Sequence, residues 1–279
     1  DLRGFTHELA ESSEHDGSRV RFCELLAEMN AATVDCSWAA LPPELRGELS
    51  RWVYIGTTGD GSLLVFLHPT DHVRHAWLCA LLLRARLQHA CRAYLVDTGR
   101  ELDFGVGVET GPVRAVGAAA HTELGTLIGC CINLASRIQA MTKTVSRTRI
   151  VYGQHVVDTL LGSMFPDEWT GSEPMGWQSD REYLEMKQRR IALNRRLCIV
   201  FLYIHNTPGF PEPRAVFRLS RSSAVVGNPR FDRVIEHLTD AGPWREQVVA
   251  LLTRTGELLP DAVSAKGALA ADGRRSGAL

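Results

Sequence analysis

Two strand-like runs separated by a glycine-rich turn constrain the fold of this chain more than any other feature. Residues 52–55 and 62–67 are rich in branched and aromatic side chains, and the segment between them reads GTTGDG. An Asp-Gly turn between two such runs is a strong β-hairpin signal. The pattern therefore predicts a hairpin with Asp60 at its tip, where the carboxylate would be exposed to a ligand.

Helical and strand-like segments alternate on either side of this hairpin. From the apolar periodicity we expect helices at about residues 18–34, 70–95, 131–141 and 154–161, and strands at 102–108, 113–117 and 149–152. The turn at 110–112 would return the strand at 113–117 onto the strand at 102–108. This order predicts an α+β fold, in which helices pack on one face of a mainly antiparallel sheet.

Beyond residue 162 the pattern becomes weaker. We expect a basic helix at 180–196, a closing hairpin made of 197–203 and 214–219, and helices at 231–238 and 244–259. The end from residue 264 is rich in Gly, Ala and Ser, which is typical of disorder. The chain is therefore divided into one domain over residues 1–220 and an accessory helical region with a disordered tail over residues 221–279.

The composition argues against several classes of partner. A formal net charge of -1 over 279 residues gives no basis for nucleic-acid binding. The most apolar stretch, residues 75–96, is interrupted by Arg84, Arg86 and Arg92, so a helix packed on a sheet explains it better than a membrane span. Seven cysteines without CxxC pairing are typical of reduced thiols, and we expect a cytoplasmic protein.

A second acidic motif stands at the start of the sequence. The run DLRGFT places Asp1 before a Gly-Phe-Thr turn, an arrangement that suits a metal-bound triphosphate. If Asp1 and Asp60 face one cleft, they provide two hard carboxylates. Such ligands are what two Mg²⁺ or Mn²⁺ ions need for phosphoryl chemistry.

Two further segments complete a family pattern. Residues 105–113 read GVGVETGPV and residues 129–137 read GCCINLASR. Together with residues 1–6 and 57–61, in this order over roughly residues 1–161, they resemble the catalytic domain of bacterial class III adenylate and guanylate cyclases. The resemblance implies a ferredoxin-like, palm-type sheet. It also implies a signal-transducing lyase that converts a nucleoside triphosphate, with ATP as the default, into a 3′,5′-cyclic nucleotide and pyrophosphate.

The resemblance further implies how the triphosphate is held. The carboxylates of Asp1 and Asp60 and the main-chain carbonyl of Leu2 would bind two divalent cations, Mg²⁺ or Mn²⁺. The phosphate oxygens would be bound by main-chain N–H groups near three residues in succession: Gly4, Phe5 and Thr6.

The same resemblance assigns the reacting end of the substrate to a helix. Asn133 would orient the ribose, and Arg137, a permanent planar cation, would stabilise charge on the phosphorus and the leaving group. In this family the metal-binding aspartates and the Asn–Arg pair come from different protomers. The resemblance therefore implies a homodimer with two shared active sites, in which a lone chain is inactive.

The base-selecting positions depart from the family pattern. Gly56 stands where adenylate cyclases usually have lysine and guanylate cyclases glutamate, and Thr126 stands where they often have aspartate and cysteine. A hydroxyl donates and accepts, so Thr126 does not choose between adenine and guanine. Tyr54 or Thr57 could supply a substitute contact. The loss at Gly56 keeps open an alternative function, a catalytically silent cyclase homology domain that senses nucleotide or dimerises.

Two further expectations follow from the resemblance. A diguanylate cyclase, which shares the two-metal logic, is disfavoured because the sequence contains no Gly-Gly-Asp/Glu-Glu-Phe signature. In the family the first aspartate ends a central strand, and the given chain contains none of that strand before Asp1. We therefore expect exposed sheet edges and an incomplete core.

Overall fold

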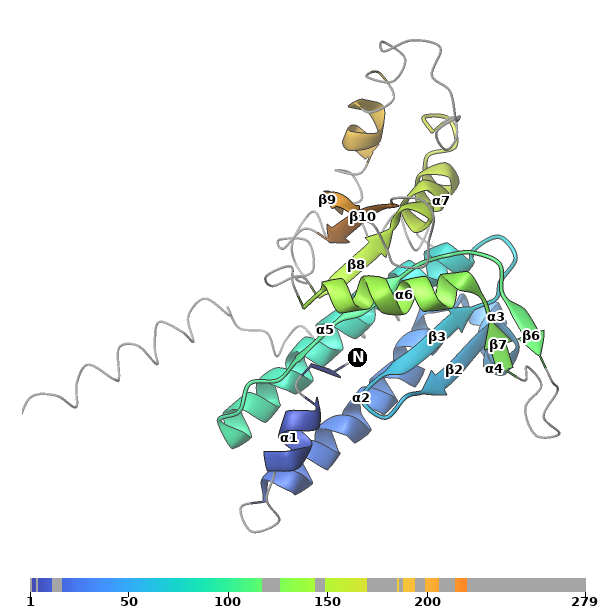
Figure 1. Cartoon of the computed structure of the whole chain (residues 1–279). Helices are drawn as coiled ribbons and strands as arrows, with labels where there is room; N and C mark the ends of the chain where they lie inside the picture. The colour runs from blue at the N-terminus through green and yellow to red at the C-terminus, as the bar shows by residue number, and fades with distance from the viewer. Residues whose placement is uncertain are drawn as a thin grey trace, which may run out of the picture.

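The computed structural model describes a layered arrangement of helices and small sheets (Figure 1). The described residues are 2–3, 5–11, 17–116, 126–143, 149–169, 185, 188–193, 199–205 and 214–219. Asp1, Gly4 and everything expected beyond residue 220, including the helices at 231–238 and 244–259, lie outside them. In the part of the chain that is described, every helix is too short or too polar to span a bilayer.

Two long helices form the base of the domain. Helix α2 (Ser18–Ala40) and helix α5 (His72–Thr98) confirm two of the helices that the apolar periodicity predicts, and they pack along each other. Helix α5 ends at Gly99, whose φ of 72° is the left-handed conformation that favours glycine at a helix end. Trp77 of α5 is fully buried and stacks on Tyr152 at 4.3 Å between ring centroids, which ties the helical layer to a strand above it. Three short helices accompany this pair: α1 (Phe5–Glu11), α3 (Pro43–Arg46) and α4 (Leu49–Trp52).

The predicted hairpin is confirmed. Strands β2 (Val53–Thr57) and β3 (Ser62–Phe66) pair antiparallel, from Val53 opposite Phe66 to Thr57 opposite Ser62. The Thr58 N–H donates to the Gly61 carbonyl at 2.9 Å, and Gly59 adopts a φ of 83° that the turn requires. This geometry places Asp60 in the connecting turn.

A second sheet has four strands in the order β5-β8-β10-β9. Its members are β5 (Val106–Val108), β8 (Ile150–Gly153), β9 (Ile199–His205) and β10 (Arg214–Leu219). The β9–β10 hairpin is antiparallel, which confirms the predicted closing hairpin, whereas β5 and β8 are parallel. Helix α6 (Cys130–Met141) lies between β5 and β8 in the sequence, and α7 (Gln154–Met164) follows β8.

One predicted pairing is wrong. The expected strand at 102–108 is split into β4 (Asp103–Phe104) and β5, and β6 (Arg114–Val116) does not return onto it. Instead, β6 pairs antiparallel with β7 (Thr126–Ile128) in a hairpin of its own. The physical reason is that β6 finds its antiparallel partner in β7, whereas β5 pairs in parallel with β8, Val106 opposite Ile150, through the crossover that α6 provides.

A short strand lies at the start of the described chain. Strand β1 (Leu2–Arg3) pairs antiparallel with β4, Leu2 opposite Phe104 and Arg3 opposite Asp103. The Arg3 guanidinium donates to the Asp103 carboxylate at 2.7 Å, and Arg149 lies 2.9 Å from the other carboxylate oxygen. The fold is thus of the α+β class, with small, mostly antiparallel sheets, and β1 links the layer of β4 to the β2–β3 hairpin.

Candidate functional site

The structure brings two of the sequence motifs together. The main-chain N–H of Leu2, in the first acidic motif, donates to the main-chain carbonyl of Asp60 in the hairpin turn at 2.8 Å. The Leu2 side chain is buried in the main core, which fixes the backbone of this residue. The half-buried Asp60 therefore lies beside the strand that directly follows Asp1 in the sequence.

The direction of the main-chain carbonyl of Leu2 decides whether its oxygen is available to a cation beside Asp60. In an extended strand, the N–H and C=O of one residue project from the same edge. Since the N–H of Leu2 points to Asp60, its carbonyl oxygen faces the same hairpin. This corner therefore offers one carboxylate and one carbonyl, both of which are hard oxygen ligands. Among the described residues no group of three or more His, Cys, Asp or Glu side chains is arranged to hold a metal ion.

Phe5 and Thr6 open helix α1. The first N–H groups of a helix have no acceptor inside it, so the amides of this turn are free of helical hydrogen bonds by geometry. The Phe5 ring packs 5.5 Å from the ring of Phe22 on α2, whereas Thr6 is exposed. The hydrophobic contact of Phe5 thus anchors the start of α1 next to β1.

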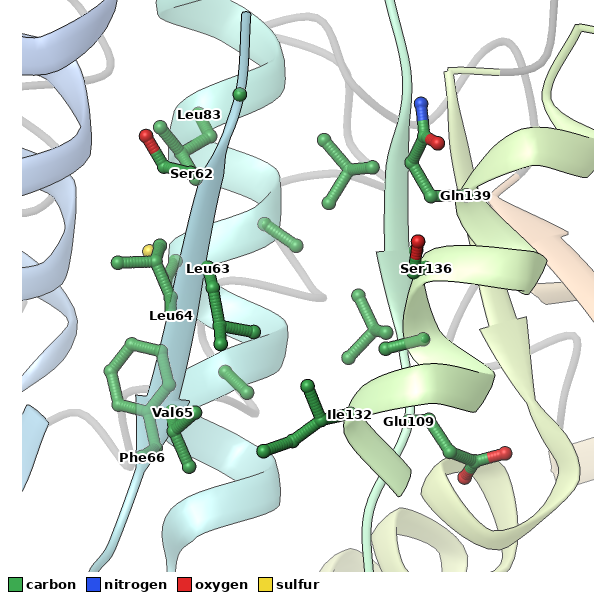
Figure 2. A pocket seen from close by; sticks show the side chains of 18 of the residues that line it. Ser62, Leu63, Leu64, Val65, Phe66, Leu83, Glu109, Ile132, Ser136 and Gln139 are labelled. Atoms are coloured by element: carbon green, nitrogen blue, oxygen red, sulfur yellow. The ribbon is translucent and has the colours of Figure 1, made fainter. Parts of the chain in front are cut away.

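Asn133 and Arg137 lie one turn apart on the exposed side of α6. The buried stripe of this helix, Leu134, Ile138 and Met141, packs against Val151 and Val216 of the four-stranded sheet. A third face, which carries Ile132 and Ser136, borders a cavity that Asp60 also borders (Figure 2). Within one chain, Asn133 and Arg137 are therefore not on the cavity face that Asp60 shares.

Thr126 lies on the β6–β7 hairpin. It is the first residue of β7, pairs with Val116 and is exposed, away from the cavity lining. The hairpin stands out at the side of the molecule (Figure 1), and its Val116 and Ile128 are each 51% exposed. The structure therefore does not bring Thr126 together with Asp60.

The space beside Gly56 is filled by the side chain of Tyr54. A Cβ atom built on Gly56 would lie 3.0 Å from Cε1 and 3.2 Å from the hydroxyl oxygen of Tyr54, two residues earlier on the same face of β2. The phenol ring of Tyr54 thus lies over Gly56 and takes the space of a side chain there. The strand presents a phenol where the family pattern has a charged group.

The cavity contains an acidic residue that the sequence analysis did not single out. Glu109 follows β5, its side chain is 1% exposed, and its Oε1 accepts from the Thr110 N–H at 2.9 Å. His155 lies 3.8 Å away. The signal was a lone carboxylate inside the glycine-rich run GVGVETG. That run serves in the sequence analysis only as a segment of the family pattern, and Glu109 has no role there.

A histidine under the hairpin is held uncharged. The His75 ring of α5 lies 6.5 Å from the ring of Phe66 and 5.5 Å from that of His68. Burial lowers the pKa of His75 to about 4, against a smaller opposing effect of Asp71. The neighbouring His72 lines the cavity, and its Nε2 is hydrogen-bonded to the Thr110 hydroxyl at 2.9 Å. These contacts tie the hairpin and α5 to the segment that follows β5.

Comparisons with known proteins find similarity in structure but not in sequence. No family model matches the chain, and no curated protein sequence matches it. Among solved structures, the crystal structure of the guanylyl cyclase Cya2 is similar with a TM-score of 0.48 and 16% sequence identity, over 78% of this chain and 87% of that chain. At this similarity the function has to be argued from the residues of the chain itself.

Proposed function

We propose that the chain is the catalytic domain of a class III-type nucleotide cyclase. It converts a nucleoside triphosphate, with ATP as the first candidate, into the 3′,5′-cyclic nucleotide and pyrophosphate. The observation that carries the proposal is the hydrogen bond from Leu2 to Asp60 at 2.8 Å. It joins the first and second acidic motifs, which are far apart in the sequence, at one corner of the fold. A metal site shared by the two acidic motifs requires that they lie close together in the fold.

The donor set at this corner fits a hard divalent cation. Mg²⁺ in phosphoryl-transfer sites is usually held by one or two carboxylates together with substrate phosphates. Here Asp60 and the Leu2 carbonyl, with Asp1 as the second carboxylate, would hold two such ions. When bound, they would acidify the ribose 3′-hydroxyl and neutralise the triphosphate. Main-chain N–H groups near Gly4, Phe5 and Thr6 would bind the phosphate oxygens, and Phe5 and Thr6 open α1 next to this corner.

The other half of the site comes from a second copy. Asn133 and Arg137 are exposed on the face of α6 that does not border the cavity with Asp60. A partner surface can therefore reach them, with Asn133 orienting the ribose and Arg137 stabilising charge on the leaving pyrophosphate. The β6–β7 hairpin, with its exposed Val116 and Ile128, offers apolar surface for such a homodimer.

Base selection is assigned to Tyr54 rather than to Gly56. The phenol over Gly56 both donates and accepts a hydrogen bond. It can therefore contact adenine or guanine without the strict preference of a lysine or glutamate. We expect weak selectivity between ATP and GTP, and Tyr54→Phe removes the polar contact while keeping the ring over Gly56.

A second candidate function is a silent nucleotide-sensing or dimerisation module. It is favoured by one observation, the missing charged side chain at Gly56. It is opposed by the presence of Asp1, Asp60, Asn133 and Arg137 at their expected places in the sequence, because a domain without turnover has no need for all four. The two candidates differ in one measurable property, which is formation of cyclic product.

The test is a turnover assay with a matched pair of aspartate variants. ATP, GTP, CTP and UTP are offered separately with Mn²⁺, and cyclic nucleotide and pyrophosphate are quantified. We expect product from the wild-type chain and at least roughly a hundredfold less from Asp60→Ala, because loss of an outer partner of a metal ligand already costs about 10–100-fold and Asp60 is a direct ligand in this proposal. The control Asp97→Ala should retain wild-type rates. Asp97 is an exposed aspartate on α5, remote from the hairpin.

Two outcomes would overturn parts of this proposal. Activity of Asp60→Ala close to wild type would remove Asp60 from the mechanism. No product from any nucleotide, together with nucleotide binding in an equilibrium assay, would replace the enzyme by the sensing module. Circular dichroism of each variant checks that a loss of product is not a loss of fold.

A further inference from the structure

Helix α1 buries a glutamate and exposes a leucine. Glu8 is 4% exposed, whereas Leu9 next to it is 45% exposed and Ala10 is exposed as well. Among the side chains of α1 that the structure describes, Glu8 alone is fully buried. A helix held by hydrophobic packing turns its leucine inward and its carboxylate outward. The burial of Glu8 therefore indicates that a specific polar contact sets the orientation of α1.

Two groups at the end of α5 hold the Glu8 carboxylate. The hydroxyl of Tyr94 donates to its Oε1 atom, and a guanidinium N–H of Arg100 donates to the same atom at 3.2 Å. Burial and the hydrogen bond to Glu8 raise the pKa of the Tyr94 phenol well above its usual range, so the hydroxyl keeps its proton and remains a donor. Pairing of this kind offsets most of the cost of taking a carboxylate out of water.

The two donors are themselves fixed in place. The Thr98 hydroxyl donates to the main-chain carbonyl of Tyr94 at 2.7 Å and accepts from the main-chain N–H of Arg100 at 3.2 Å. The Tyr94 ring lies 6.3 Å from the ring of Phe22 on α2. Helix α1 thus lies beside the start of α2 and the end of α5 (Figure 1). Because hydrogen bonds are directional and these donors do not move with α1, the carboxylate meets them in one rotation of the helix only.

We propose that Glu8, Tyr94 and Arg100 form a latch that sets the orientation of α1, and that Glu8 is thereby a positioning residue for the triphosphate. Residues 4–6, to which the proposed function assigns the phosphates, join β1 to the first turn of α1. Strand β1 is fixed by its pairing with β4, so the orientation of α1 decides where the amides of this segment point. The role in phosphate binding rests on the proposed function, whereas the latch rests on the contacts of Glu8.

The sharpest test replaces both buried partners by apolar groups. In Glu8→Leu/Tyr94→Phe neither buried group is left without its partner, and Arg100, whose side chain is 30% exposed, can be hydrated instead. Stability should therefore stay close to that of the wild type. The orientation of α1, in contrast, would depend on apolar contact without direction. The control is Glu44→Leu, because Glu44 is an exposed glutamate on α3.

Binding is measured by calorimetry with inorganic tripolyphosphate and Mn²⁺, because this probe has the phosphates without base or ribose. We expect the double variant to bind about tenfold more weakly, the loss that corresponds to one hydrogen bond to a charged group. In the turnover assay KM should rise by the same factor and kcat should stay within about twofold, because the latch supports binding equally in the ground state and the transition state. The control should match the wild type in both assays, and the urea midpoints of all three proteins should agree.

Single variants show whether the two residues act as one unit. Glu8→Leu and Tyr94→Phe should each cause most of the loss in affinity, and the double variant should lose little more than the weaker-binding single variant. Glu8→Gln keeps an acceptor in the same place, so its affinity should lie within about threefold of wild type.

Hydrogen–deuterium exchange tests the latch without any phosphate. On peptides that cover Phe5–Glu11, exchange should be about fivefold or more faster in the double variant than in the wild type or in Glu44→Leu. This measurement needs neither substrate nor turnover. It therefore separates a failure of the latch from a failure of the proposed function.

Three results would overturn the proposal. They are unchanged affinity and exchange in the double variant, effects of the two single variants that add in full, and a loss of affinity that appears only together with a lowered urea midpoint. If tripolyphosphate does not bind even to the wild-type chain, the proposed function fails, and the phosphate role of Glu8 fails with it. The exchange measurement would still decide whether the latch holds α1.

Discussion

The close packing of α6 on β5 makes Gly107 a position at which a single added methyl group meets the backbone of a neighbouring helix. A Cβ atom built on Gly107 would lie 2.2 Å from the carbonyl oxygen of Ala135 and 2.5 Å from the main-chain nitrogen of Gln139. Both atoms belong to the backbone of α6, so no side-chain rotation relieves the overlap. Gly107→Ala therefore forces α6 and β5 apart.

The magnitude follows from this geometry. Restoring ordinary contact requires a displacement of about 1 Å of a helix whose other face is packed against Val151 and Val216. Overpacking of a well-filled core typically costs about 1–3 kcal/mol, and the upper half of that range applies because the atoms are main-chain atoms. The lower entropy of the unfolded alanine chain returns about 0.5 kcal/mol. We expect Gly107→Ala to lower the free energy of unfolding by about 2 kcal/mol.

Urea unfolding followed by circular dichroism measures this difference. For a slope of about 2 kcal/mol per molar urea, the midpoint should fall by about 1 M. The control is Gly47→Ala, because Gly47 has a φ of −64° and no heavy atom within 4 Å of the added methyl group. Its midpoint should stay or rise slightly. Indistinguishable midpoints for the two variants would refute the claim that α6 rests directly on the backbone of β5.

Three further predictions concern the site, the pH dependence and the helix pair. Asp60→Ala and Arg137→Ala, each inactive alone, should regain up to about a quarter of wild-type activity when mixed, because random pairing places one intact site in half of the dimers; verified heterodimers without activity would contradict shared sites. The lowered pKa of His75 means that the unfolded chain binds a proton more readily. Stability should therefore fall by about 2 kcal/mol from pH 7 to pH 5, and this loss should be smaller in His75→Phe by urea unfolding at both values. Arg86→Met removes the ion pairs to two carboxylates of α2 and should cost about 1 kcal/mol in low salt. Less than half of this difference should remain at 1 M NaCl in the same assay.

The elements that the sequence predicted well are those fixed by local signals. The β2–β3 hairpin follows from strand-forming runs around an Asp-Gly turn, and α5 follows from its apolar periodicity. The pairing of β6 was predicted wrongly because a short turn suggests a return to the preceding strand. The true partner of β5 is β8, which comes after α6 in the sequence, and no local signal reports a parallel pairing of that kind.

In the candidate site, too, the features set by local signals were predictable from the sequence and the long-range contacts were not. Placing Asp60 in the hairpin turn needed only hairpin chemistry, although the structure leaves it half-buried rather than fully exposed. The exposure of Asn133 and Arg137 agrees with their spacing of four on a helix. The contact between Leu2 and Asp60 is long-range, and only the family resemblance anticipated it. Tyr54 and Thr57 were the two possible substitute contacts in the sequence analysis, and the packing of Tyr54 over Gly56 could not be predicted from the sequence. It depends on which way a side chain turns on the strand.

Helix α6 connects the proposed chemistry to the packing of the fold. One of its faces carries Asn133 and Arg137, a second borders the cavity through Ile132, and its backbone rests on β5 at Gly107. A displacement of about 1 Å of a catalytic group is enough to reduce turnover substantially. Since Gly107→Ala moves α6 by about that distance, this variant should lower the rate of any cyclase reaction that the chain performs as well as the free energy of unfolding.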